Sequence, residues 1–183
     1  MPNMDFFGFF DYTVGDPDTY EYMAKEFAEM MRLVVPNGVV MHVGNGFGLT
    51  RSGLSCTLGA GAVWLEGHHG GNRGSTPITL PAAASGNNRI DYIIAELYIP
   101  QRRIALTTLS GTPTTGTPTA PTLQTTESLY QFPLYRFRVS GASVSTVEDV
   151  RVFNQSGSRI RVGSAAPAYA GLSPGEIYIQ LEG

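Results

Sequence analysis

Short apolar runs, interrupted by glycine, proline and asparagine, make up most of this chain beyond residue 38. The 183 residues include 22 Gly and 12 Pro, and such turn residues recur too often for long helices to form between them. In several runs apolar residues alternate with small or polar ones, which is typical of strands with one buried face. Strands are predicted at residues 39–43, 54–58, 62–68, 77–81, 89–99, 104–109, 130–139, 150–153, 159–162 and 176–180, with a helical turn at 146–149. This spacing favours an all-β sandwich or barrel over βαβ units, and we expect a mainly β fold, a β-sandwich.

One amphipathic helix is predicted before the strands, at residues 20–34. Residues 16–18, Asp-Pro-Asp, supply a capping carboxylate and a first-turn proline, and residues 36–38, Pro-Asn-Gly, end the helix. Its apolar stripe consists of Met23, Phe27, Met30 and Val34. Residues at this spacing share one helix face, which packs on the core of the same chain or on a neighbouring chain.

Apolar segments also lie at both ends of the sequence. The first 13 residues contain Phe6, Phe7, Phe9, Phe10 and Tyr12. Each buried aromatic side chain removes about 150–250 Å² from water, so this arm packs on its own domain or docks on a neighbouring subunit. The predicted units are an N-terminal arm and helix at 1–38, the sandwich at 39–153 and a small C-terminal β-strand extension at 154–183.

Charge and cysteine content narrow the classes of function. The net charge of −3 argues against a surface that binds nucleic acid by neutralising phosphates. No apolar run approaches the roughly 20 residues of a membrane span, and no basic and then apolar leader is present. Cys56 is the only cysteine, which excludes an internal disulfide framework. Only 15% of the residues are charged, against about 25% in ordinary soluble domains, which suggests a surface covered by partner chains.

No residue pattern in the sequence indicates catalysis, a metal site or a cofactor. Residues 44–48, Gly-Asn-Gly-Phe-Gly, lack the lysine and the helix that follow a phosphate-binding loop, and they are predicted to form a hairpin turn. His68 and His69 are adjacent and would point to opposite faces of a strand, so we expect both to lie in a turn. No spacing of serine, histidine and aspartate orients a base on a nucleophile. We therefore expect a protein that is not an enzyme.

The predicted strand at 89–99 begins with two opposite charges. Arg89 and Asp91 share one face of the strand, close enough for an ion pair that fixes the preceding turn, or for two solvated side chains at a strand end. The apolar run that follows predicts burial on both faces. Residues 111–126, rich in Thr, Pro and Gly, are expected to be extended, as a strap on a neighbouring subunit or a linker within the same one.

The order of several short segments carries a resemblance to a known family. The segments are residues 22–27 (YMAKEF), 61–67 (GAVWLEG), 87–94 (NNRIDYII), 101–106 (QRRIAL), 111–113 (GTP), 118–121 (PTAP), 130–134 (YQFPL) and 141–145 (GASVS). The series resembles tailed-bacteriophage baseplate and tail-appendage proteins and is similar to baseplate upper proteins and minor tail proteins. The last residues, from 163 to 180, also look like a short repeat element of phage tail fibres.

This resemblance implies a virion structural protein of a phage tail tip or baseplate, made in the host cytoplasm. Such a subunit assembles as a homo-oligomer, by resemblance a homotrimer, and attaches fibres or receptor-binding subunits. Its expected partners are copies of itself and other tail or baseplate proteins. The candidate interface residues are Phe6, Phe7, Phe9, Phe10, Met23, Phe27, Met30, Ile177, Tyr178 and Ile179.

An alternative is a receptor-binding tail protein that binds a carbohydrate of the host surface. Aromatic side chains on strands can stack on sugar rings, although they more often belong to a core or an interface. The candidates for such stacking are Trp64, Tyr98, Tyr130, Tyr135, Tyr169 and Tyr178.

Overall fold

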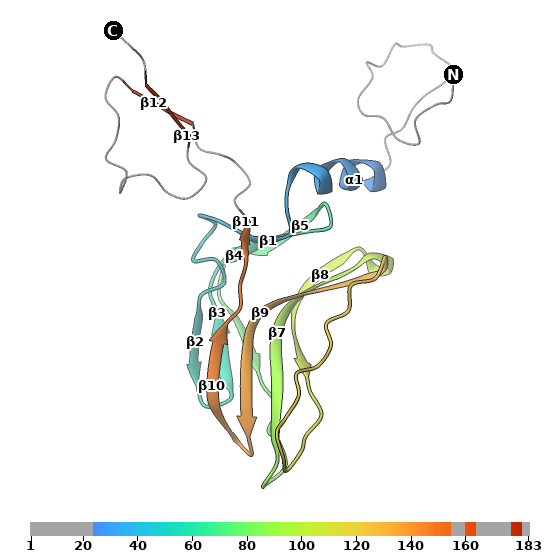
Figure 1. Cartoon of the computed structure of the whole chain (residues 1–183), viewed down its shortest axis with the longest axis vertical. Helices are drawn as coiled ribbons and strands as arrows, with labels where there is room; N and C mark the ends of the chain where they lie inside the picture. Colours follow the sequence, from blue (N-terminus) through green and yellow to red (C-terminus); the bar gives the residue numbers. More distant parts are fainter. Residues whose placement is uncertain (1–23, 155–159, 164–176, 181–183) are drawn as a thin grey trace.

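The computed structural model describes residues 24–154, 160–163 and 177–180 (Figure 1). Among them one α-helix, α1 (Ala24–Val34), precedes the strands. The strands are β1 (Gly38–Val40), β2 (Leu49–Ser52), β3 (Ser55–Leu58), β4 (Gly61–Leu65), β5 (His68–Asn72), β6 (Thr76–Thr79), β7 (Asn88–Tyr98), β8 (Arg103–Ser110), β9 (Leu129–Ser140), β10 (Ser143–Asp149), β11 (Phe153–Asn154), β12 (Ile160–Gly163) and β13 (Ile177–Gln180). A 3-10 turn, η1 (Ile99–Gln101), joins β7 to β8.

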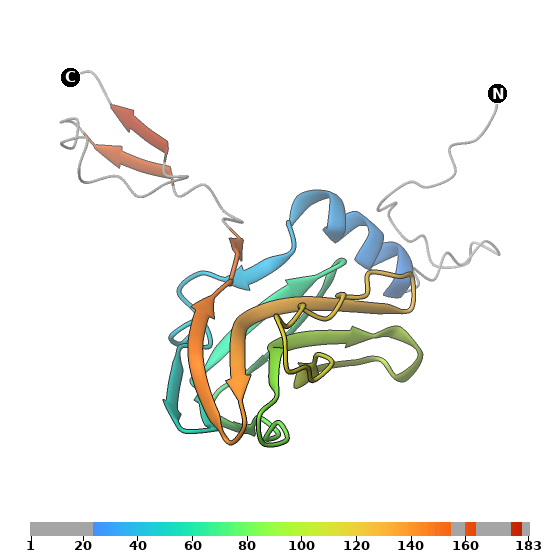
Figure 2. The same cartoon turned by 60° about the horizontal axis from the view of Figure 1, so that its bottom comes forward.

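Two layers of strands enclose the core (Figures 1 and 2). One layer is a four-stranded sheet in the order β10-β9-β7-β8, and the other combines a sheet β11-β1-β4-β5 with a sheet β2-β3-β6. Both layers contribute to one buried apolar cluster, which includes Val39, Leu58, Val63, Leu65, Ile93, Leu97, Phe137 and Val139. The arrangement is a mainly β, sandwich-like fold, as the strand pattern predicted.

The strand β7 is the central element of its sheet. It pairs with β9 over its whole length and with β8 from Asp91 onward. Ile93 and Ala95 are buried on the core side, and Ile94 is fully buried on the opposite side. The prediction of a strand buried on both faces is therefore confirmed for the middle of β7.

The Thr- and Pro-rich segment 111–126 lies as a strap across the outer face of this sheet (Figure 1). At its start, the amide of Gly111 donates to Ile90 O at 3.0 Å. This contact lies on the edge of β7 that pairs with β8, one residue past the last β7–β8 pair. At its end, Gln124 O accepts from Gln131 N at 2.8 Å, on the opposite side of β9. The segment therefore crosses from one side of the β7–β9 pair to the other, over the face that carries Ile94.

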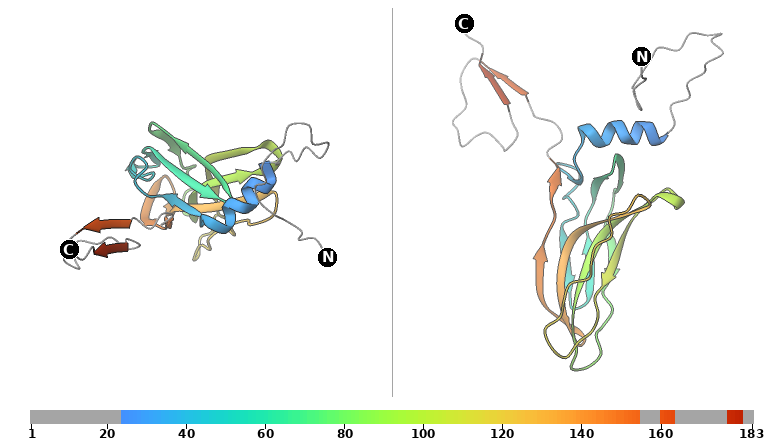
Figure 3. Two further views of the ribbon diagram at one scale, coloured as in Figure 1. Left: turned by 90° about the horizontal axis from the view of Figure 1, so that it is seen from above. Right: turned by 45° about the vertical axis from the view of Figure 1, so that its right-hand side comes forward.

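The helix α1 lies across one end of the sandwich, next to the β4–β5 hairpin (Figure 3). Ala28 faces the hairpin and is buried, as is Val35 just beyond the helix. Phe27 is 50% exposed and Val34 is 70% exposed. Of the two alternatives for the Met23 stripe, packing on the core of the same chain does not hold for Phe27 and Val34; Met23 lies outside the described residues.

Several local predictions need correction. The strand predicted at 39–43 ends at Val40, and of the strand predicted at 150–153 only Phe153 lies in β11. Residues 146–149 belong to β10 and form no helical turn, because they pair with β9. His68 and His69 lie in β5 and not in a turn. The turn at 44–48 joins β1 and β2, which belong to different sheets, so it closes no hairpin. The predicted strand 62–68 is divided by a turn at residues 66–67, where both φ angles are positive.

Near the C-terminus, β12 and β13 pair with each other in parallel register. The proposed boundaries at residues 38/39 and 153/154 fall inside β1 and β11. Within the described part of the chain, no helix is long and apolar enough to cross a lipid bilayer.

Candidate interaction surface

Strands β1 and β11 pair with each other, so the first and the last strand of the sandwich domain in the sequence lie side by side. Val39 pairs in parallel with Phe153, and Val39 N donates to Val152 O at 2.8 Å. Gly38 permits this approach, since a Cβ on it would lie 2.7 Å from Asn154 N. As a result, α1 and β11 lie at the same end of the molecule (Figure 1).

Six of the eight exposed large hydrophobic side chains in the described residues lie on α1, in the loop after β1, or at and just before β11. We call this set the apolar end; it consists of Phe27, Leu33, Val34, Val43, Val152 and Phe153. Leu33 is 72% exposed and Val152 60% exposed. Single exposed hydrophobic residues are normal on protein surfaces, but a concentration on neighbouring elements is typical of interaction sites.

Arg151 fixes β11 against the sandwich. Its guanidinium lies 5.0 Å from the ring centre of Tyr135 and 5.1 Å from that of Phe153, a geometry that favours cation–π attraction. Its Nη1 donates to Gly46 O at 2.7 Å, and its Nη2 donates to Asp149 Oδ2 at 2.6 Å. The hydrogen bond from Arg151 lowers the pKa of Asp149.

A second set of polar contacts fixes the base of α1. Glu66 accepts from Arg32 Nη1 at 3.2 Å and from the side-chain amide of Asn37. The backbone N of Glu66 in turn donates to Asn37 Oδ1 at 2.7 Å. These contacts join the end of α1 to the β4–β5 turn, so the apolar end is held in place before any partner binds.

The Arg89–Asp91 pair lies inside the sandwich. Arg89 Nε donates to Asp91 Oδ1 at 2.7 Å and Nη2 donates to Oδ2 at 2.8 Å, a bidentate arrangement. Asp91 Oδ1 also accepts from Gly111 N at 3.1 Å, and Arg89 donates to Pro81 O. The pair joins the loop before β7 to the first residue of the strap, which is a structural role.

The remaining predicted interface residues divide into three groups. Phe6, Phe7, Phe9, Phe10 and Met23 lie outside the described residues. Ile177, Tyr178 and Ile179 lie on β13, of which the structure describes the backbone. Phe27 is exposed and Met30 half-buried on α1. Sequence reasoning missed Leu33, Val152 and Phe153; the run of three apolar residues at 33–35 was the available signal, because a helix face cannot bury all three.

The surroundings of Cys56 and His68 bear on the question of catalysis or metal binding. The thiol of Cys56 is buried, and burial raises its pKa. His68 Nδ1 contacts Glu66 O at 2.9 Å, and no group of three or more His, Cys, Asp or Glu side chains in the described ranges is placed to hold a metal ion. Residues 171–175, Gly-Leu-Ser-Pro-Gly, have the spacing of a nucleophile elbow and lie outside these ranges. The proline after Ser173 lacks the N–H that such an elbow supplies to an oxyanion.

Among the aromatic residues considered for sugar stacking, those whose side chains the structure describes do not form an open platform. Tyr135 is buried and donates its hydroxyl to Phe47 O at 3.1 Å. The ring of Trp64 stacks on His69 at 5.4 Å, and its Nε1 is buried without a partner among the described residues. Tyr98 and Tyr130 are half-buried. Tyr169 lies outside the described residues, as does the side chain of Tyr178.

Comparison of the chain with protein-family models, with curated proteins and with solved structures finds no match.

Proposed function

We propose that this protein is a structural subunit of a phage tail tip or baseplate. It assembles with copies of itself and attaches fibres or receptor-binding subunits. The phage assignment rests on the ordered sequence segments that resemble baseplate and tail-appendage proteins. The assembly role is supported by the apolar end, which is exposed in the single chain and held by Arg151 and Glu66.

The size of the apolar end indicates how strongly it can hold two subunits together. Full burial of a Val, Leu or Phe side chain contributes about 1.5–3 kcal/mol, so several partly exposed side chains contribute roughly 5–10 kcal/mol on this scale. Association costs about 4–15 kcal/mol in lost freedom. Burial of the apolar end alone therefore barely offsets the free-energy cost of association. We assign the additional binding energy that a stable oligomer needs to the Phe-rich arm at residues 1–13.

The carbohydrate-binding alternative receives less support from the same residues. Tyr135 is not accessible to a ligand, and one face of Trp64 is covered by His69. A glycan array with the full chain tests this alternative, and we expect no sugar-specific signal.

The location of the protein tests the proposal most simply. An antibody to the sandwich, used with gold labelling on virions produced with this gene, is expected to mark the tail tip. The variant Leu33→Ser/Val34→Ser is expected to be left out of the virions, whereas Val147→Ser, on the distant β10, is incorporated. Virions without any label, or equal incorporation of both variants, would contradict the proposal.

A further inference from the structure

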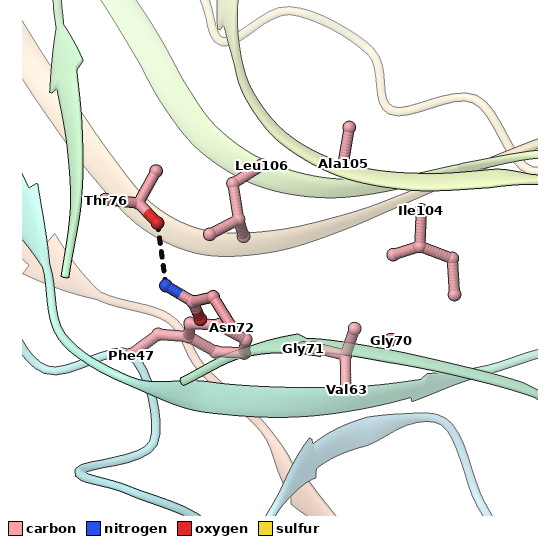
Figure 4. Close-up of a pocket in the computed structure, with 9 residues that line it drawn as sticks. All are labelled: Phe47, Val63, Gly70, Gly71, Asn72, Thr76, Ile104, Ala105 and Leu106. Carbon is pink, nitrogen blue, oxygen red and sulfur yellow. Dashed lines mark hydrogen bonds between the residues drawn. The ribbon is translucent and has the colours of Figure 1, made fainter. Parts of the chain in front are cut away.

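A cavity of about 200 Å³ opens between the two layers of the sandwich (Figure 4). It lies at the seam between β5 and β8, which are edge strands of their sheets. Gly70, Gly71 and Val63 line one side, Ile104 and Leu106 the other, and Phe47 also contributes. Within the described chain no further strand pairs with the outer edge of β5 or of β8.

The lining of the seam favours an aromatic side chain. A Cβ on Gly70 would come within 3.0 Å of the Ile104 side chain. Because glycine has no Cβ, β5 can lie this close to β8 and no side chain of residue 70 occupies the cavity. An apolar cavity of roughly 150 Å³ binds benzene, and this one is somewhat larger. One phenyl ring therefore fits it by volume and by chemistry.

Asn72 adds a polar feature at the edge of the cavity. Its Nδ2 donates to Thr76 Oγ1 and to Gly74 O, each at 2.7 Å. Its Oδ1 is buried and has no hydrogen-bond partner among the described residues. Buried acceptors are rarely left unpaired, and Asn72 gives the lining of the cavity a polar edge.

The charges around the seam match one segment of the chain itself. Residues 5–11 read Asp-Phe-Phe-Gly-Phe-Phe-Asp, four aromatic residues with a carboxylate on each side. Two exposed arginines lie next to the strands of the seam: Arg73 follows β5, and Arg102 precedes β8. Arg103, the first residue of β8, is already paired with Glu96 at 3.6 Å. Opposite charges of this kind steer a segment and fix its register.

We propose that the seam between β5 and β8 binds residues 5–11 of a neighbouring copy of the chain, with one phenyl ring in the cavity. This inference rests on the proposed function, because the oligomer supplies the neighbouring copy. Residue 10 is fourteen positions before Ala24 of α1, and that length of chain spans up to about 50 Å when extended. That length is sufficient to reach an adjacent subunit.

Photo-crosslinking in the full chain tests the contact. Benzoyl-phenylalanine replaces Phe7 or, separately, Phe10, since these side chains lie on opposite faces of an extended segment. Unlabelled and ¹⁵N-labelled copies are mixed before irradiation. We expect crosslinks to residues 70–72 or 104–106 that join a labelled copy to an unlabelled one. Crosslinks within one copy, crosslinks to other surfaces or no crosslinks would overturn the inference.

A variant with a filled cavity provides the second measurement. Leu106→Trp occupies the space and is expected to lower the yield of these crosslinks by about tenfold or more, since the burial of one phenyl ring is lost. Thr107→Trp, the next residue on β8 and outside the lining, is the matched control. Equal yields from the two variants would contradict the assignment. Light scattering on the same samples separates the two proposals: a monomer refutes the proposed function, and an oligomer with crosslinks elsewhere refutes only this inference.

Discussion

Gly67 lies against the carbonyl oxygen of Ala28, so close that a Cβ on residue 67 would overlap that oxygen. Its φ angle of +78° also lies in the region that favours glycine. Gly67 forms the turn between β4 and β5, and Ala28 is the buried residue of α1. This contact determines how closely the helix approaches the sandwich and which helix face stays exposed.

Substitution of Gly67 by Ala is expected to displace α1. Gly86→Ala is the matched control, because Gly86 has the same φ angle and a Cβ on it would meet nothing within 4 Å. The control costs about 1 kcal/mol through its backbone conformation, and Gly67→Ala costs roughly 1–3 kcal/mol more through the overlap. Urea unfolding measures both values. Equal losses of stability would show that the helix does not rest on Gly67.

Breaking the buried ion pair is expected to be costly. Asp91→Asn leaves the charge of Arg89 buried without its counter-ion, which costs about 3–5 kcal/mol. The control Glu148→Gln breaks the exposed pair with Arg136 and costs less than about 1 kcal/mol. Chemical denaturation distinguishes the two cases. A loss for Asp91→Asn as small as that of the control would contradict a structural role for the pair.

The contact between Asp149 and Arg151 makes the free energy of unfolding depend on pH. The hydrogen bond from Arg151 lowers the pKa of Asp149 in the folded protein. The pair therefore stabilises the fold above about pH 4, the ordinary aspartate value, and this contribution is lost as the pH falls through the lowered folded pKa. The Asp149 side chain is 50% exposed, so the effect is below about 1 kcal/mol.

Asp149→Asn tests this dependence. The free energy of unfolding is measured from about pH 6 to about pH 3, the window in which an aspartate titrates. We expect the wild-type value to fall more steeply than that of the variant. Parallel curves for the two proteins would mean that Asp149 titrates equally in the folded and unfolded chains.

The central strands could be predicted from the sequence because their signal is local. β7 and β9 contain long apolar runs between turn residues, and both were placed to within about two residues. β2 and β5 were missed because their residues, Leu-Thr-Arg-Ser and His-His-Gly-Gly-Asn, lack an apolar alternation. They are strands because β3 and β4 pair with them, and such pairing depends on contacts that a local pattern does not contain.

The apolar end was only partly predictable. The amphipathic pattern identified the helix and the apolar stripe that contains Phe27 and Val34, but it left open whether that stripe packs on the same chain or on a neighbour. The structure buries Ala28 instead, because the hairpin approaches the helix at Gly67 and a small residue permits that contact. Similarly, residues 146–149 resemble a helical turn, yet Glu148 pairs with Arg136 across β9 and β10. In both cases a distant partner overrides the local pattern.

Deletion of residues 1–13 is expected to weaken assembly without unfolding the sandwich. The buried apolar cluster of the described residues is assembled from residues between Val39 and Val139, and the four phenylalanines of the arm supply the binding energy that the apolar end lacks. Circular dichroism checks the fold, and size exclusion with light scattering checks the mass. An unchanged mass for the truncated protein would show that the arm does not hold the subunits together.

The mass of the full chain in solution tests the central claim most directly. Sedimentation equilibrium over a range of concentrations is expected to give a multiple of 19.7 kDa, three times that mass if the phage resemblance holds. The Leu33→Ser/Val34→Ser variant is expected to shift toward the single-chain mass. A monodisperse species of 19.7 kDa at every concentration would contradict the account, because the apolar end would then remain exposed without a partner copy.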